Sequence, residues 1–174
     1  FVADAQYAPE AFDQERELIR PPSAADLGAG NHFLEFGVVD AIYDRHAAYQ
    51  AGLKLGDVTV MIHTGSRDGG FHVGKRWMDL AKQHWPTGHK HPAHGLYGLS
   101  GRLAGEYLRA MGVAARYAWF NRMALAELVR AALHDIASDG DSRLIVDVPH
   151  NVVTQEDGLN VHRKGSTPAH AGQW

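Results

Sequence analysis

The sequence predicts a mixed α/β protein of the α+β class, and two patterns lead to this prediction. Three short runs are rich in Val, Ile, Leu and Phe, as is typical of strands. Longer stretches repeat apolar residues about every 3.6 positions, as on one face of a helix. The chain has 174 residues, of which 45% are hydrophobic and 21% charged. This balance is normal for one globular domain or for part of a larger one.

The predicted strands are residues 31–40 (NHFLEFGVVD), 57–63 (DVTVMIH) and 144–148 (LIVDV). The second run is mostly apolar and β-branched, so we expect both of its faces to be buried. Residues 41–56, which connect the first two strands, are expected to form a turn or a short helix.

Helices are predicted for residues 9–19, which Pro21 and Pro22 would terminate, and for residues 72–84 and 101–136. The last segment is long enough for two helices, and Ser100 is a suitable N-cap residue for it. Loops are expected in most of the remaining chain, including residues 64–70, 85–100, 138–142 and 150–174.

The composition narrows the class of protein. No apolar run reaches the roughly 18 residues of a membrane span, and no leader follows Phe1, so we expect neither a membrane anchor nor a signal peptide. The chain has no cysteine, which excludes disulfides within it and suits a reducing cytoplasm. A net charge of -3 argues against a uniformly basic nucleic-acid binder but leaves room for a local basic patch.

Histidine is unusually frequent, with 12 residues in the chain. His32 opens the first predicted strand, His63 closes the second, and His150 follows the third. Ligand sites favour the ends of strands, and three neutral imidazoles meeting there can bind a divalent transition metal. The alternative is that each of these histidines is only a hydrogen-bonded side chain.

His32 has polar neighbours in the sequence. Asn31 and Glu35 flank His32, and strict alternation places Asn31, Phe33 and Glu35 on one face of the strand and His32 and Leu34 on the other. Glu35 could equally be a solvent-facing residue without a role.

Two loops have the composition of anion-binding sites. Residues 63–70 (HTGSRDGG) combine glycines with Ser66 and Arg67, which suits a phosphate, although the loop lacks the ending of a Walker motif. Residues 162–167 (HRKGST) offer two adjacent cations and two hydroxyls, which suit a phosphate or a nucleic-acid backbone. The alternatives are an ordinary glycine-rich turn and a solvated basic turn.

Five motifs, taken together, resemble the RtcB family of RNA ligases, and they occur in the family's order. They are LGAGNHFLEF at 27–36, HTGSR at 63–67, EYLRAMGVAARYAWFNR at 106–122, PHN at 149–151 and VHRKGSTPA at 161–169. The resemblance implies a partial RtcB-like catalytic fold. It also implies a ligase that joins an RNA 2′,3′-cyclic phosphate or 3′-phosphate end to a 5′-hydroxyl end. Such an enzyme uses GTP and Mn²⁺, passes through a histidine–GMP intermediate, and acts on tRNA halves or on broken RNA.

The resemblance also implies roles for individual residues. His32, His63 and His150 match metal ligands of the family. Arg67 and Lys164 match positions where a contact to phosphate or RNA is expected. Arg163 lies in the same basic loop as Lys164. The positions that match nucleotide contacts are Asn31, His32, Phe33, Leu34, Glu35, His150 and Asn151.

Two family features have no counterpart in the sequence. The family's upstream Asp-x-x-Cys pair is missing, and so is the downstream histidine that accepts the guanylate. We therefore interpret residues 1–174 as the central part of a single catalytic domain that is inactive by itself. Two alternatives stay open: a non-catalytic RNA- or metal-binding remnant of the fold, and a metal-dependent phosphoesterase. The sequence does not identify any protein partner.

Overall fold

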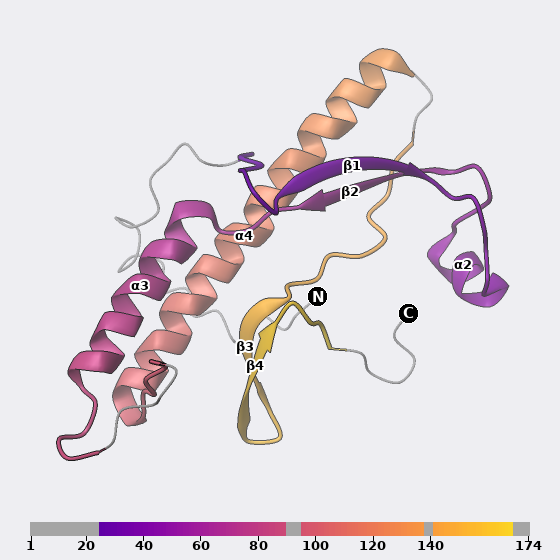
Figure 1. Cartoon of the computed structure of the whole chain (residues 1–174). Coiled ribbons are helices and arrows are strands. Elements are labelled where there is room, and N and C mark those ends of the chain that lie inside the picture. The colour runs from indigo at the N-terminus through magenta and orange to yellow at the C-terminus, as the bar shows by residue number, and fades with distance from the viewer. Residues whose placement is uncertain (1–24, 90–94, 138–140, 169–174) are drawn as a thin grey trace.

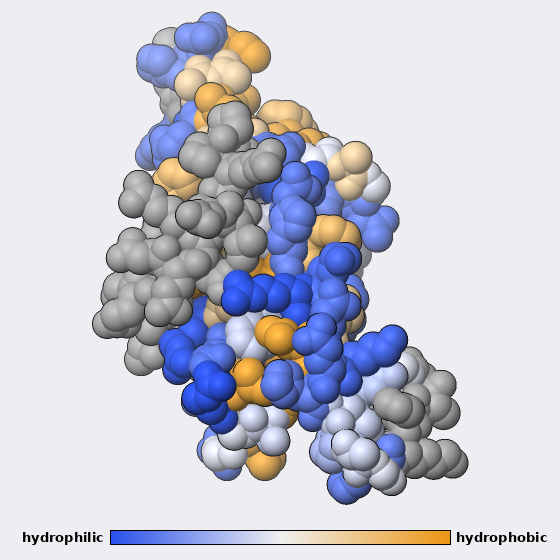
Figure 2. Space-filling model, turned by 90° about the vertical axis from the view of Figure 1, so that its left-hand side faces the viewer, coloured by the Kyte–Doolittle hydropathy of each residue, from blue (hydrophilic) through white to orange (hydrophobic). Residues whose placement is uncertain are grey.

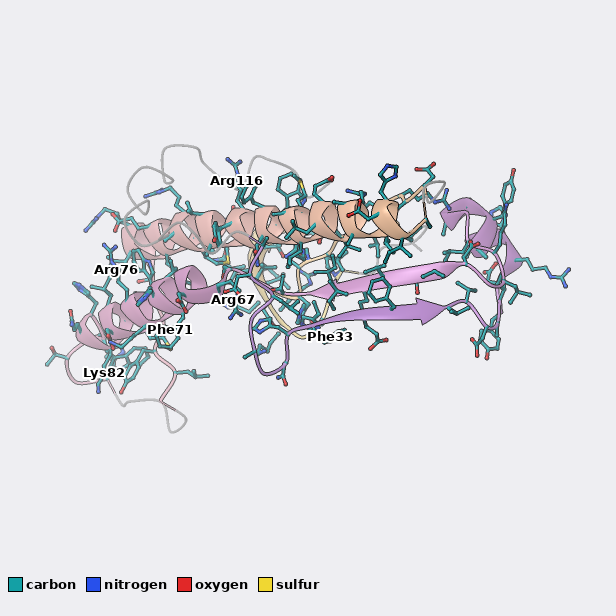
Figure 3. The ribbon with its side chains drawn as sticks, turned by 90° about the horizontal axis from the view of Figure 1, so that it is seen from above. Phe33, Arg67, Phe71, Arg76, Lys82 and Arg116 are labelled. Atoms are coloured by element: carbon teal, nitrogen blue, oxygen red, sulfur yellow. The ribbon has the colours of Figure 1, made fainter. Side chains whose placement is uncertain are left out.

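The computed structural model describes residues 25–89, 95–137 and 141–168. Within them the chain forms three helices and two separate antiparallel strand pairs, which confirms the α+β class. A long helix, α4, runs through the whole molecule (Figure 1). Helix α3 lies along the N-terminal half of α4, and the β1–β2 ribbon runs beside its C-terminal half (Figures 1 and 3).

The helix pair α3 (Arg67–Gln83) and α4 (Gly101–Ile136) provides the main hydrophobic core. Val73 and Trp77 of α3 pack against Ala110 and Ala114 of α4. The small side chains of α4 at this contact allow the two helices to approach closely. The segment that could have formed two helices is one continuous helix of 36 residues, with Ser100 at its N-cap position.

Helix α3 begins earlier than the sequence predicts. The expected glycine-rich loop ends at Ser66, and residues 67–70 form the first turn of the helix. Gly69 is buried there, so a glycine read as a loop signal instead provides room for packing.

The first strand pair joins β1 (Phe33–Val38) to β2 (Val58–His63), with Phe33 opposite His63. The expectation that the second strand is buried on both faces is wrong, since Val58 is 66% and Met61 58% exposed. The sheet has only two strands, and the described residues do not cover both of its faces. The predicted turn or short helix between them contains helix α2 (Arg45–Ala51), capped by the Asp44 side chain.

The C-terminal part differs most from the prediction. Residues 144–148 form no strand in the described structure, whereas 151–164, expected to be a loop, form the hairpin β3 (Asn151–Glu156) and β4 (Leu159–Lys164). Its Asp157-Gly158 turn has φ of 49° and 78°, the positive values that a tight hairpin turn requires. A run of Val and Ile forms a strand only where a partner strand supplies hydrogen bonds, and residues 144–148 have none among the described residues.

The helix predicted at residues 9–19 and residues 138–140 of the predicted turn lie outside the described residues. Among the helices that are described, none combines the length and apolar character of a membrane span.

Candidate functional site

An open cleft of about 720 Å³ lies where the end of β2, the start of α3, the middle of α4 and residues 148–152 meet. Three stretches far apart in the sequence, with His32 before β1, therefore contribute to one concave surface. The polar residues of its lining on which the following argument depends are His32, His63, Arg67, Arg122, His150 and Asn151.

The three predicted metal-binding histidines come together at this cleft. The Nε2 atoms of His63 and His150 are 3.1 Å apart, and the His32 ring centroid is 6.2 Å from that of His63. His32 directly precedes β1, His63 ends β2, and His150 directly precedes β3. His150 was expected to follow a strand at residues 144–148, but in the structure it precedes a strand, β3.

The spacing of His63 and His150 fits two ligands of one ion. Two nitrogens bound at about 2.1 Å in adjacent positions lie roughly 3 Å apart, and imidazole is a donor that divalent transition metals accept. The same distance also fits an N–H···N hydrogen bond between neutral rings. Within the described residues, no group of three or more His, Cys, Asp or Glu side chains is close enough to form a complete metal site.

The protonation of His150 favours a ligand role. Burial, and then the charges of His63, Lys164 and Arg122, lower the pKa of His150 below its ordinary value. The neutral ring is therefore favoured near neutral pH, and only a neutral imidazole has a lone pair for a metal.

His32 has a partner for its second ring nitrogen. Its Nδ1 lies 2.9 Å from the Ala29 carbonyl oxygen and 3.2 Å from Nη1 of Arg67. If Nδ1–H donates to the shorter contact, Ala29, the Nε2 lone pair is free. A backbone carbonyl that fixes the ring in this way is common behind metal-binding histidines.

Arg67 is held at the edge of the cleft. Its Nε donates to Asp26 Oδ2 at 3.1 Å, and its side chain is only 18% exposed. The guanidinium lies against Gly28, where an added Cβ would come within 2.2 Å of the guanidinium carbon. This packing requires a residue without a side chain at position 28.

A buried residue that the sequence analysis did not assign, Asn121 of α4, connects the surrounding loops. Its side chain is fully buried; it accepts a hydrogen bond from Asp26 N–H at 2.9 Å and donates to the carbonyls of Asp26 at 2.8 Å and Gly65 at 3.2 Å. Thr64, also buried, donates to the Leu27 carbonyl at 2.8 Å. The available signal was an amide within an apolar helix, since burying an amide is costly unless it is hydrogen-bonded.

The predicted nucleotide-contacting residues divide into two groups. His32, His150 and Asn151 line the cleft, whereas the other four do not. Burial alternates along this stretch as predicted, with His32 and Leu34 partly buried. The four outside the lining are Asn31, Phe33, Leu34 and Glu35.

The two cations of the basic loop have different surroundings. Arg163 forms a two-point ion pair with Glu156, with Nη2–Oε2 at 2.8 Å, and this hydrogen bond raises the pKa of Arg163. Lys164 faces Asn151 across the hairpin, and its Nζ is 3.3 Å from Asn151 Oδ1. Lys164 is thus next to the cleft, while Arg163 is neutralised by Glu156.

Another ion pair fixes the segment that leads to His150. Arg122 Nε donates to Asp147 Oδ1 at 2.7 Å, and both side chains are less than one-fifth exposed. Since Arg122 belongs to α4, this pair attaches the unpaired segment before β3 to the central helix.

Imidazoles beside a guanidinium in an open cleft define a site suited to a metal ion and a phosphate. Comparison with known proteins gives the family. The sequence matches the tRNA-splicing ligase RtcB family over residues 4–173, so the chain belongs to the RtcB family.

Three curated relatives, each named tRNA-splicing ligase RtcB, are 34% identical to the chain. The match covers 92% of the chain and 36% of the protein from Thermococcus kodakarensis. It covers 92% of the chain and 20% of the protein from Pyrococcus horikoshii, and 86% and 35% for Methanococcus maripaludis. The chain thus spans about a third or less of the length of these relatives.

Proposed function

We propose that this chain is the central part of a single catalytic domain of an RNA ligase that acts in tRNA splicing or RNA repair in the cytoplasm. In this proposal the whole protein joins RNA 2′,3′-cyclic phosphate or 3′-phosphate ends to 5′-hydroxyl ends. It uses GTP and Mn²⁺ and forms a histidine–GMP intermediate on a residue outside the chain. Membership of the RtcB family supports the reaction class.

The observation that carries the proposal is the meeting of His32, His63 and His150 with Arg67 at one cleft. The three histidines would hold Mn²⁺, which when bound neutralises charge on phosphate oxygens. Arg67 presents a planar set of donors that matches two phosphate oxygens. Because Asp26 and Gly28 already fix its side chain, little ordering remains when phosphate binds.

The remaining residues would orient the substrates. We assign nucleotide contacts to His32, His150 and Asn151 and to the four other residues on and before β1, and a phosphate or RNA contact to Lys164. Lys164 suits this role because its ammonium group donates to Asn151 Oδ1 at 3.3 Å, and Asn151 lines the cleft next to His150. The four residues are Asn31, Phe33, Leu34 and Glu35.

Titration of Mn²⁺ by calorimetry tests the metal site. His63→Ala and His150→Ala should each weaken binding by more than about 100-fold, because even loss of a residue behind a ligand costs 10–100-fold. His134→Ala, which removes an exposed histidine near the end of α4, serves as the matched control and should bind normally. Binding unchanged in both cleft variants would contradict the site.

A ligation assay on the protein expressed from its whole reading frame tests the reaction. RNA with a 3′-phosphate and RNA with a 5′-hydroxyl should be joined only when GTP and Mn²⁺ are both present. Release of phosphate without GTP would indicate a phosphoesterase instead. Binding of RNA or metal without any turnover would indicate the non-catalytic remnant.

A further inference from the structure

The side of α3 that faces away from the core carries cations alternating with apolar side chains. Its residues are spaced by three or four positions, so they form one continuous stripe along the helix. We call these residues the α3 stripe: Arg67, Phe71, Lys75, Met78 and Lys82.

The stripe lies opposite the buried face of the helix, which consists of Gly69, Val73, Trp77 and Ala81. Phe71 is 66% and Met78 63% exposed, and the Lys75 side chain is 64% exposed. Arg67, Phe71 and Lys82 follow one side of the helix in Figure 3, and Arg76 lies nearer α4. Seen from the α3 side, Figure 2 shows hydrophobic residues interspersed among hydrophilic ones.

The stripe is continuous with the cleft, because Arg67 and Phe71 belong to both. Phe71 therefore lies at the edge of the cleft, where a nucleic-acid strand bound in the cleft would pass as it leaves the cleft. From Arg67 to Lys82 the helix is about 22 Å long at about 1.5 Å per residue, so a short stretch of an extended strand can follow it.

The charge of this region differs from that of the whole chain. Residues 67–122 contain nine of the 17 Lys and Arg but only three of the 20 Asp and Glu, although the chain as a whole carries a net charge of -3. This stretch of the sequence therefore carries a local excess of positive charge, which favours attraction of a polyanion.

We infer that the α3 stripe binds the single-stranded RNA next to the reacting end. Phe71 stacks on an unpaired base at the mouth of the cleft, and Lys82 contacts a phosphate farther out. Lys75 contacts another phosphate in place of its exposed, weak ion pair with Asp79. This arrangement rests on the proposed function, since it takes the cleft to hold an RNA end. Exposed aromatic residues alternating with cations are the usual means of binding a single strand without sequence preference.

A protein partner fits the stripe less well. Lysine is depleted in the buried centre of protein–protein interfaces, and here Lys75 lies between the two exposed apolar residues while Lys82 follows them. A duplex also fits poorly, because its bases are already stacked and cannot cover Phe71.

Fluorescence anisotropy with a labelled short oligouridine, using the full protein, tests the stripe. Phe71→Ala should weaken binding by about 5-fold to 100-fold, the range for loss of one base–aromatic stack, with little change in salt dependence. Lys82→Ala should lower the slope of log affinity against log salt by about 0.7, the value for one phosphate contact on a single strand.

Two matched controls come from the distant α2 region. Tyr49→Ala removes an aromatic side chain that is 84% exposed, and Lys54→Ala removes an exposed cation. Both variants should bind oligouridine like the unaltered protein. Circular dichroism of all four variants verifies that they fold.

Wild-type affinity and salt slope in both stripe variants would overturn the inference. If such variants still ligated RNA, the proposed function would stand without the stripe. If the unaltered protein bound oligouridine through the stripe but ligated nothing, the proposed function would fail and the stripe would stand. A change in self-association by light scattering, without a change in RNA affinity, would identify the stripe as a protein interface and refute the inference.

Discussion

Replacing Asn121 by Leu should destabilise the protein strongly while preserving the volume of the side chain. The change removes the acceptor for Asp26 N–H and the donor for the Asp26 and Gly65 carbonyls. Each buried group left unsatisfied costs about 1–3 kcal/mol, and part of this is recovered where water reaches the loops. We therefore expect a loss of about 3 kcal/mol, or a fall in Tm of roughly 6–12 °C for a chain of this size.

Urea unfolding followed by tryptophan fluorescence measures this loss, and Trp77 in the buried core provides a signal. Asn160→Leu is the matched control, because Asn160 is exposed and its hydrogen bond from Gln155 is long at 3.4 Å. It should change the free energy of unfolding by less than about 0.5 kcal/mol. A loss below about 1 kcal/mol for Asn121→Leu would refute the view that this amide holds the cleft loops.

Three further predictions concern other parts of the structure. Burial raises the pKa of Tyr107 above 10.0, so the folded state keeps a proton that the unfolded state releases; stability should fall as pH rises above 10, and Tyr107→Phe should reduce that fall in urea titrations at several pH values. Gly28→Ala should cost about 1–3 kcal/mol, because φ at Gly28 is +93° and the new methyl would displace Arg67; a crystal structure with Arg67 unmoved would contradict this. Asp147→Ala leaves the mostly buried Arg122 without this acceptor and should lower the free energy of unfolding in urea by about 1–3 kcal/mol; a loss below about 0.5 kcal/mol would show that the pair does not hold the segment.

Much of the fold could be predicted because its signals are local. The 3.6-residue repeat of residues 101–136 matches α4 in both bounds, since the helix's hydrogen bonds lie within the segment itself. The strands at 33–38 and 58–63 fall inside the predicted runs. The Asp157-Gly158 hairpin turn was also a local signal, but the polar residues around it favoured a loop.

Residues 144–148 show where local signals fail. Their composition is that of a strand, yet a strand needs a neighbour to satisfy its backbone groups, and within the described residues none lies beside them. The prediction that the second strand is buried on both faces was wrong for a similar reason, because the sequence of one strand does not determine how many strands its sheet contains.

The sequence alone determined the family, the long helix α4 and the residue types that suit a metal ion and a phosphate, because these depend on composition, order and short-range spacing. Only the tertiary structure decided that His63 and His150 approach to 3.1 Å across 87 positions. It also showed that Asn121 connects the segments of Asp26 and Gly65, which lie next to Arg67, and that Phe71 lines the cleft. These facts depend on how distant segments pack, and packing is settled by the whole set of contacts rather than by any single stretch of chain.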